Sequence, residues 1–466
     1  MPRGEIPNEL KISPKNKFKI NDNGLKVVSE VYNGGIATVS VYLKAGSRFE
    51  PQTMSGVSYL AQKMLLFGNN NVDQSQVKKF LEQNGTNIEV TIDREKIGFT
   101  VSVLKDNLDK ALNLFSKLFT NPVFSEAQFE VQKENLAREA ARVSEDQMEA
   151  TIDSAHNVCF RDHQMGQPLK GNKDTIRDLQ LSDVKEFLSS RLYQSNMVVV
   201  ATGDLNCEDF EAKALSAFEK VEKYEQPVLE KYTIETPLFT SSLTLMRDDE
   251  MPYFNGGVFF KGPGYGHEDM TALNFITSIL GEYRADIGIN MHLNSSDRQY
   301  HSAHKFLADC PDLLIHKCMI LPYSDVSMIG GYGYGNEVYA SKIMYYTQYI
   351  LSFYGKYINQ ADVFRTRAEL FNKLLTKQTG LELNEEIANE ALYLSRRIDR
   401  TEMAYRYSHL SDTEHLQRIA NKWFYGKDVA AIGWGSCHGI IANGVFSRNL
   451  FRSTLGRSGA YPFLAS

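Results

Sequence analysis

Histidine and cysteine are densest between positions 301 and 318, where they suggest a metal site. The residues in question are His301, His304, Cys310, His316 and Cys318. Closed zinc sites normally show ligands in tight pairs, and this spacing matches no such pattern. The run at 312–315 among them is typical of a buried strand. We therefore interpret these side chains as scattered core and loop residues, with a metal site as the alternative.

Two further groups carry weaker chemical signals. Cys437 and His438 follow a predicted strand and could form a reactive pair, but adjacent side chains usually point away from each other. The glycines at 331, 333 and 335 alternate with tyrosine and superficially resemble a phosphate loop. They lack the lysine and Ser/Thr at the required spacing and have no helix directly after them. We expect a structural role for the first group and a Gly-rich strand or turn for the second.

The whole chain has the composition of a globular protein. It has 466 residues, 42% hydrophobic and 23% charged, so two or more domains are expected. The net charge of −6 gives no electrostatic case for binding nucleic acid or an anionic membrane. No apolar run approaches the ~18–20 residues that span a bilayer. The five scattered cysteines favour a reducing compartment.

The first residues do not resemble a targeting segment. They lack a secretory apolar core and the Arg- and Ser-rich stretch of a transit peptide. We expect that the protein needs no cleavable signal or carries its address within the mature chain.

The chain repeats itself. A strand, a glycine turn and a helix from about Ser55 follow Val41, and the same order follows Val258, with a helix from about Met270; Lys44 and Lys261 are 217 positions apart. A later Leu-Ser-Asp segment, a tyrosine and a strand also recur, with Tyr193 and Tyr425 separated by 232 positions. Two matches in the same order predict a duplication. The additional ~15 residues predict a lengthened loop between about 281 and 330.

Each half mixes strands and helices. Alternation predicts strands at 87–93 and 98–104, and helical spacing predicts helices at 107–119 and 128–142. Ser182 or Asp183 is the expected N-cap of a further helix. The predicted fold class is α+β, with two homologous α/β halves, each a mainly antiparallel sheet covered by helices. The predicted organisation is an N-terminal extension at 1–17, halves at 18–225 and 246–440, a linker at 226–245 and a basic-aromatic tail at 441–466.

The segment from Val41 to Gly68 resembles the metal-site region of the pitrilysin-like peptidases. The likeness includes the run at 45–48, Gly56 and Phe67-Gly68. It is strongest to the subunits of the mitochondrial processing peptidase and to the core subunits of respiratory complex III. Segments 248–252, 262–264 and 396–398 resemble the beta-type subunit in particular. The resemblance implies two homologous halves that enclose a cavity.

Active members of this family carry the zinc motif H-x-x-E-H on the first helix. The corresponding positions here are Tyr59, Gln62 and Lys63, and the chain has no histidine before His156. The family's third ligand, a glutamate, corresponds to Glu139. The resemblance therefore implies a degenerate site with no catalytic residue, no metal and no other cofactor. Lys63 either pairs with Glu139 in place of the metal, or both are unrelated solvated charges.

The resemblance implies a non-catalytic core subunit of mitochondrial complex III, peripheral to the inner membrane on its matrix side. The alternative is the non-catalytic, presequence-binding subunit of a heterodimeric processing peptidase. The implied partners are the paired core or processing-peptidase subunit, other complex III subunits and presequence peptides. No nucleic acid and no transmembrane span are expected.

Two stretches are candidate contact surfaces for partners. Eight of the 24 tyrosines fall between Tyr332 and Tyr357, and tyrosine is enriched at protein interfaces. The alternative is a helix at about 338–354 that uses some of them for its own core. The tail after Gly444 carries three arginines and several aromatic residues, and it either docks on a neighbouring subunit or is a loosely ordered end.

Overall fold

The computed structural model describes residues 5–222, 235–285, 313–353, 355, 358–377, 380–410, 412–437 and 440. The chain divides into two compact units. The first comprises residues 1–146, 162–237 and 368–408, and the second comprises 147–161, 238–367 and 409–466. None of the described helices is long and apolar enough to cross a membrane.

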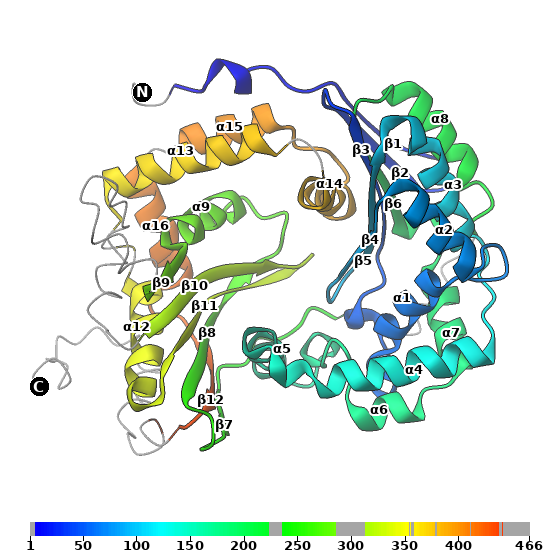
Figure 1. The fold of residues 1–466 in the computed structure, drawn as a ribbon. Coiled ribbons are helices and arrows are strands. Elements are labelled where there is room, and N and C mark those ends of the chain that lie inside the picture. Colours follow the sequence, from blue (N-terminus) through cyan, green and yellow to red (C-terminus); the bar gives the residue numbers. More distant parts are fainter. Residues whose placement is uncertain are drawn as a thin grey trace, which may run out of the picture. The chain divides into compact units, whose positions relative to one another are not determined.

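The first unit contains a six-stranded sheet in the order β1-β2-β6-β3-β5-β4 (Figure 1). Only β2 and β6 pair in parallel, and the other four pairs are antiparallel. The strands are β1 (Asn16–Ile20), β2 (Lys26–Val31), β3 (Ile36–Leu43), β4 (Ile88–Ile92), β5 (Ile97–Leu104) and β6 (Met197–Gly203).

Alternation along β3 assigns its two faces. Val39, Val41 and Leu43 join the main hydrophobic core beneath the outer helices, whereas Ser40 and Tyr42 face the other way. The outer helices of this half are α1 (Val57–Phe67), α2 (Gln74–Asn84), α3 (Leu108–Phe119), α4 (Glu126–Ala141), α6 (Lys173–Asp178), α7 (Leu181–Arg191) and α8 (Cys207–Ala217).

The second unit contains a six-stranded sheet in the order β7-β12-β8-β11-β10-β9. Its parallel pair is β7 and β12. The strands are β7 (Leu243–Arg247), β8 (Tyr253–Pro263), β9 (Glu282–Arg284), β10 (Leu313–Pro322), β11 (Val326–Asn336) and β12 (Val429–Gly435). The later helices among the described residues are α9 (Met270–Leu280), α12 (Ala340–Phe353), α13 (Gln360–Thr376), α14 (Leu381–Leu394), α15 (Arg400–His409) and α16 (Thr413–Trp423).

The strand register confirms the predicted duplication. Leu43 on β3 pairs with Met197 on β6, and Phe260 on β8 pairs with Val429 on β12. Leu43 and Phe260 are 217 positions apart, and Met197 and Val429 are 232 apart, which are the two offsets seen in the sequence. The two α+β halves therefore share one strand order, and each sheet gains one additional edge strand.

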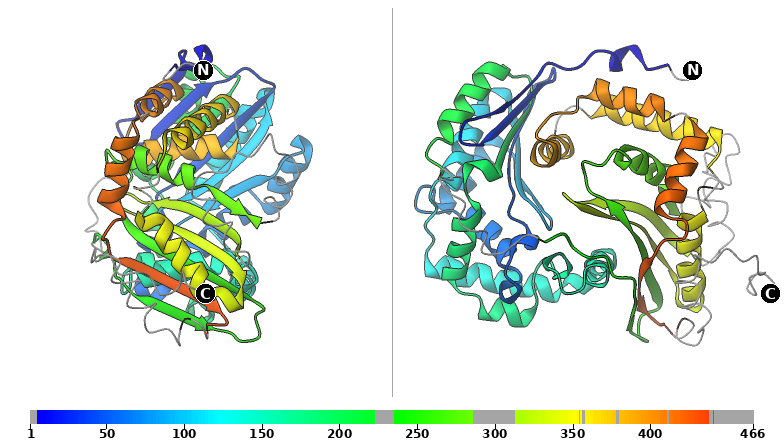
Figure 2. Two further views of the ribbon diagram at one scale, coloured as in Figure 1. Left: turned by 90° about the vertical axis from the view of Figure 1, so that its left-hand side faces the viewer. Right: turned by 180° about the vertical axis from the view of Figure 1, so that it is seen from behind.

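Each unit also takes a segment from the opposite half of the sequence, residues 368–408 in the first unit and 147–161 in the second. Helix α14 packs on β6, β3, β5 and β2 in the first unit, on the face that the outer helices leave open (Figures 1 and 2). In the second unit, α5 (Gln147–Cys159) packs on β12 and β8, while α12 packs on β11 and β8. Because helices cover both of its faces, β6 is buried along its whole length, which explains its unbroken apolar run.

Most of the predicted elements are confirmed, but one helix start was wrong. The predicted N-cap at Ser182 or Asp183 lies inside α7, because Gln180 is the N-cap. Asp183 instead accepts the backbone N–H of Gln180 at 2.8 Å from the third helical position. The corresponding Asp412 does cap α16, accepting from the N–H of Glu414.

Candidate functional site

The candidate site is built on α1, whose first turn is capped by a buried carboxylate. Gly56 precedes the helix at φ 95°, a conformation that favours glycine, and a Cβ there would lie 3.0 Å from the Lys170 carbonyl oxygen. Glu50 accepts the backbone N–H of Gly56 at 3.0 Å and that of Ser58 at 2.8 Å. Burial raises the pKa of Glu50 to about 7, although these hydrogen bonds oppose the shift.

Buried charges hold the loop before α1 against the β4–β5 turn. Arg48 and Glu95 form an ion pair at 2.6 Å with side chains 2% and 1% exposed. The N–H of Arg48 also donates to the Arg94 carbonyl at 2.7 Å. At Gly46 a Cβ would lie 2.3 Å from the carbonyl carbon of Arg94, so only glycine allows this approach. The loop that leads into α1 is therefore fixed.

The structure brings Lys63 and Glu139 together. The Nζ of Lys63 on α1 lies 2.6 Å from Oε1 of Glu139 on α4, and their side chains are 18% and 41% exposed. One helical turn earlier, the ring of Tyr59 lies 5.4 Å from the same Nζ, and the Nζ of Lys170 lies 6.0 Å from that ring. Gln62 is buried at 5% exposure. Lys63 and Glu139 therefore contact each other directly across two packed helices and are not unrelated solvated charges.

These groups do not fit a zinc ion. Zinc is held by imidazole, thiolate and carboxylate groups, and here the phenol of Tyr59 and the ammonium of Lys63 stand at two of the three ligand positions. The remaining carboxylate, Glu139, accepts a hydrogen bond from the Lys63 ammonium. Among the residues that the structure describes, no three His, Cys, Asp or Glu side chains gather where they could hold a metal.

The other groups that the sequence singled out lie in strands or outside the described residues. His316 and Cys318 lie on β10 at 1% and 8% exposure. Burial raises the pKa of the Cys437 thiol to about 11, so this cysteine is a poor nucleophile at neutral pH. The Gly-rich stretch at 331–335 is part of β11, which confirms the strand interpretation. The remaining members of these groups lie outside the described residues, namely His301, His304, Cys310 and His438, together with the tail at 441–466.

Sequence reasoning missed two buried polar arrangements. His156 on α5 lies with Nδ1 2.7 Å from the Ile152 carbonyl oxygen and Nε2 2.6 Å from the Tyr323 hydroxyl. Arg397 contacts Glu30 at 2.7 Å and Glu390 at 2.8 Å, and all three side chains are at most 5% exposed. Neither arrangement has a local sequence signal, because His156 and Tyr323 are 167 positions apart and Arg397 and Glu30 are 367 positions apart.

Two consecutive segments of the chain match models of one protein family. Residues 26–173 match the model described as insulinase (peptidase family M16), and residues 178–302 match the peptidase M16 inactive domain. The first match includes Tyr59, Gln62, Lys63 and Glu139.

The chain has homologues of two kinds. The probable mitochondrial-processing peptidase subunit beta of Arabidopsis thaliana is 24% identical over 446 residues, covering 95% of this chain and 83% of that protein. Cytochrome b-c1 complex subunit 1 of Mus musculus is 25% identical over 430 residues, covering 91% of this chain and 87% of that protein.

Two solved structures share the fold. A chain of complex III2 from Candida albicans has a TM-score of 0.78 at 18% identity, covering 93% of this chain and 99% of that one. A protease from Helicobacter pylori has a TM-score of 0.75 at 18% identity, covering 90% and 99%. At this identity the similarity shows that the fold is shared and nothing further.

Proposed function

Because this chain belongs to the peptidase family M16, we propose that it is a non-catalytic core subunit of mitochondrial respiratory complex III, ubiquinol–cytochrome c reductase. In this role it lies on the matrix side of the inner membrane, peripheral to it and held by protein contacts. It binds no cofactor and supports the electron-carrying subunits.

The observation that carries the proposal is the contact between Lys63 and Glu139. Metal-dependent peptide hydrolysis needs a metal-bound water and a general base beside it. The carboxylate that would bind the metal instead accepts from an ammonium at 2.6 Å, and the base position is the neutral amide of Gln62. A chain of this family without these hydrolytic groups suits a scaffolding role better than a peptidase role.

A second candidate is the non-catalytic subunit of a heterodimeric mitochondrial processing peptidase. It is favoured by the homologue named as a processing peptidase subunit, which matches 95% of this chain. In that role the chain binds presequence peptides for an active partner subunit.

The two roles predict different partners. A core subunit pairs with a second core subunit and with further complex III subunits, whereas a processing subunit pairs with one active peptidase subunit. Helix α12 is a candidate contact surface, because Tyr345, Tyr349 and Phe353 form a half-buried aromatic row along it.

Purification of the tagged full-length chain from its native source in mild detergent distinguishes the roles. We expect a membrane complex that contains haem in fixed ratio to the tagged chain. A haem-free heterodimer that cleaves presequences only with its partner would support the second role. Presequence cleavage by the chain alone would overturn both.

A further inference from the structure

We propose that the Lys63 ammonium takes the structural place of a metal ion between α1 and α4, so that the chain folds without metal and keeps metal out. This inference concerns the residues on which the proposed non-catalytic role rests, but it does not depend on the complex that the chain joins.

The distances support a direct replacement. A zinc ion holds its nitrogen and oxygen ligands at about 2.0–2.2 Å each in a tetrahedral arrangement, so two of those ligand atoms would lie about 3.4 Å apart. In this chain Nζ of Lys63 lies 2.6 Å from Oε1 of Glu139. The flexible four-carbon stem of lysine is longer than the arm of histidine. The ammonium therefore reaches into the space between helix and carboxylate that a metal would fill.

Tyr59 completes this arrangement on the same face of α1. Residues four positions apart on a helix are neighbours, and the Tyr59 ring lies 5.4 Å from the Lys63 Nζ. The negative face of the ring favours a cation in that place. Tyr59 is partly buried against the core, so the ring is held where it can orient the lysine.

Charge then disfavours a divalent ion. A metal could reach Glu139 only by displacing an ammonium that already makes a short hydrogen bond with it. The Lys63 side chain is 18% exposed, so water screens its repulsion of a second cation only in part. The Lys170 ammonium, 6.0 Å from the Tyr59 ring, adds positive charge nearby.

The test restores the missing ligands in the full-length chain. In Tyr59→His/Gln62→Glu/Lys63→His we expect about one zinc ion per chain by elemental analysis, and a melting temperature that falls on adding chelator. The unchanged chain should hold no stoichiometric zinc and melt at the same temperature with and without chelator. The same triple variant with Glu139→Gln is the matched control and should lose the zinc.

Two outcomes would overturn the inference. One is stoichiometric zinc in the unchanged chain, which would leave the scaffold role standing if no peptide is cleaved. The other is a triple variant with an unchanged circular dichroism spectrum that binds no zinc, which would mean that α1 and α4 do not keep the spacing of a metal site.

If the triple variant does not fold, the contact between Lys63 and Glu139 is tested by changing each residue singly. Lys63→Met and Glu139→Gln should each lower the melting temperature. The melting temperature of the double variant should be no lower than that of the less stable single variant. Additive drops would mean that the two side chains do not act together, and the inference fails.

Discussion

The ammonium of Lys96 lies 2.8 Å from the carboxylate of Glu385, although the two residues are 289 positions apart. Lys96 belongs to the β4–β5 turn, and Glu385 lies on α14, in the segment 368–408 that the later part of the chain contributes to the first unit. Nζ of Lys96 also donates to Asn389 on α14 at 2.6 Å. A charged contact therefore fixes α14 on the sheet that it covers.

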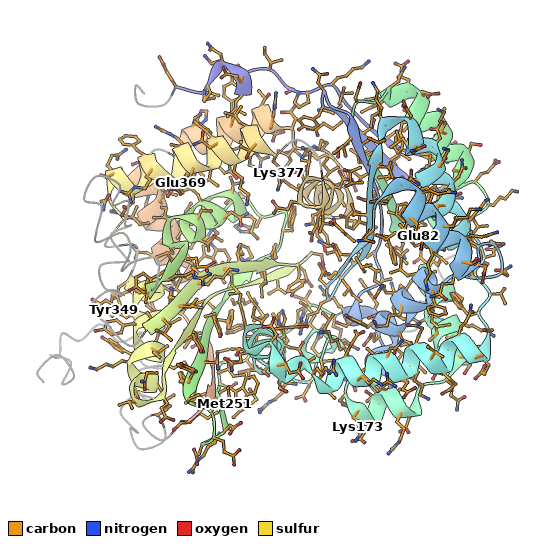
Figure 3. The ribbon with its side chains drawn as sticks, viewed as in Figure 1. Glu82, Lys173, Met251, Tyr349, Glu369 and Lys377 are labelled. Atoms are coloured by element: carbon orange, nitrogen blue, oxygen red, sulfur yellow. The ribbon has the colours of Figure 1, made fainter. Side chains whose placement is uncertain are left out.

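Lys96 is one of three consecutive buried charges in this turn. Arg94 donates to the Met165 carbonyl at 2.8 Å, Glu95 pairs with Arg48, and Lys96 reaches α14. The turn therefore joins three separate segments: the loop before α1, the loop at 164–166 and α14. Figure 3 labels Lys377, which makes another ion pair with α14, to Glu386 at 2.7 Å.

We predict that Lys96→Met destabilises the docking of α14. The Lys96 side chain is 4% exposed, and its loss leaves Glu385 and Asp93 with one partner fewer. Because those carboxylates are about one-third exposed, we expect the free energy of unfolding to fall by about 1–3 kcal/mol. Urea titration of the full-length protein measures this, and hydrogen exchange should quicken in α14.

Lys105→Met is the matched control for this change. Lys105 pairs with Asp204 at 2.9 Å, but both side chains are largely exposed, at 50% and 44%. Its urea midpoint should be unchanged. Equal shifts of the urea midpoint in the two variants would mean that the burial of Lys96 does not increase its contribution to stability.

Arg397→Met should be more damaging than Lys96→Met. It removes the cation shared by Glu30 and Glu390, whose side chains are 0% and 1% exposed. Two buried carboxylates would then lack their counter-charge, which costs about 3–5 kcal/mol of unfolding free energy. The adjacent Arg396→Met removes only an exposed pair with Glu402 and should leave the urea midpoint nearly unchanged. Similar midpoints for the two variants would contradict the prediction.

The sequence predicts the duplicated fold because period and order are local properties. Alternation at 87–93 and helical spacing at 107–119 reflect which face meets the core, and both elements form as expected. The offset of 217 residues also recurs in the strand register, between Leu43 on β3 and Phe260 on β8. These features depend on neighbouring residues, so one sequence is enough to find them.

The exchange of α5 and α14 depends on tertiary packing and has no such local sign. A helix with a mixed surface, such as α14, has the same sequence pattern whichever sheet it covers. Asn384 on α14 is fully buried, and the first sheet satisfies its amide. It accepts a hydrogen bond from the Thr202 hydroxyl at 2.7 Å and donates one to the Ser40 hydroxyl at 2.8 Å. Likewise, Lys63 and Glu139 are 76 positions apart on two different helices, and no pattern in either helix predicts their contact.

We predict that Tyr349→Ala weakens assembly with partner subunits. Tyr349, labelled in Figure 3, stacks on Tyr345 with ring centroids 5.7 Å apart and contacts Phe353 at 4.9 Å. A central aromatic anchor at an interface contributes about 2 kcal/mol or more, so the assembled fraction on a native gel should fall at limiting concentration. Tyr405→Ala, which removes a 48% exposed tyrosine from α15, is the control. Equal assembly of both variants would place the interface elsewhere.

The stability of the protein should fall as pH rises towards 7, and Glu50 should account for part of the fall. Its pKa is raised from the ordinary 4.5 to about 7, so the folded state holds the proton more tightly than the unfolded state does. The contribution is complete below about pH 4.5 and is lost as pH rises through about 7. Between pH 4.5 and 8, the free energy of unfolding should therefore fall by on the order of 3 kcal/mol more in the unchanged chain than in Glu50→Gln. Urea titrations at several pH values measure the difference, in which groups common to both chains, such as the buried Glu390, cancel. Parallel profiles for the two chains would show that Glu50 is not the titrating group.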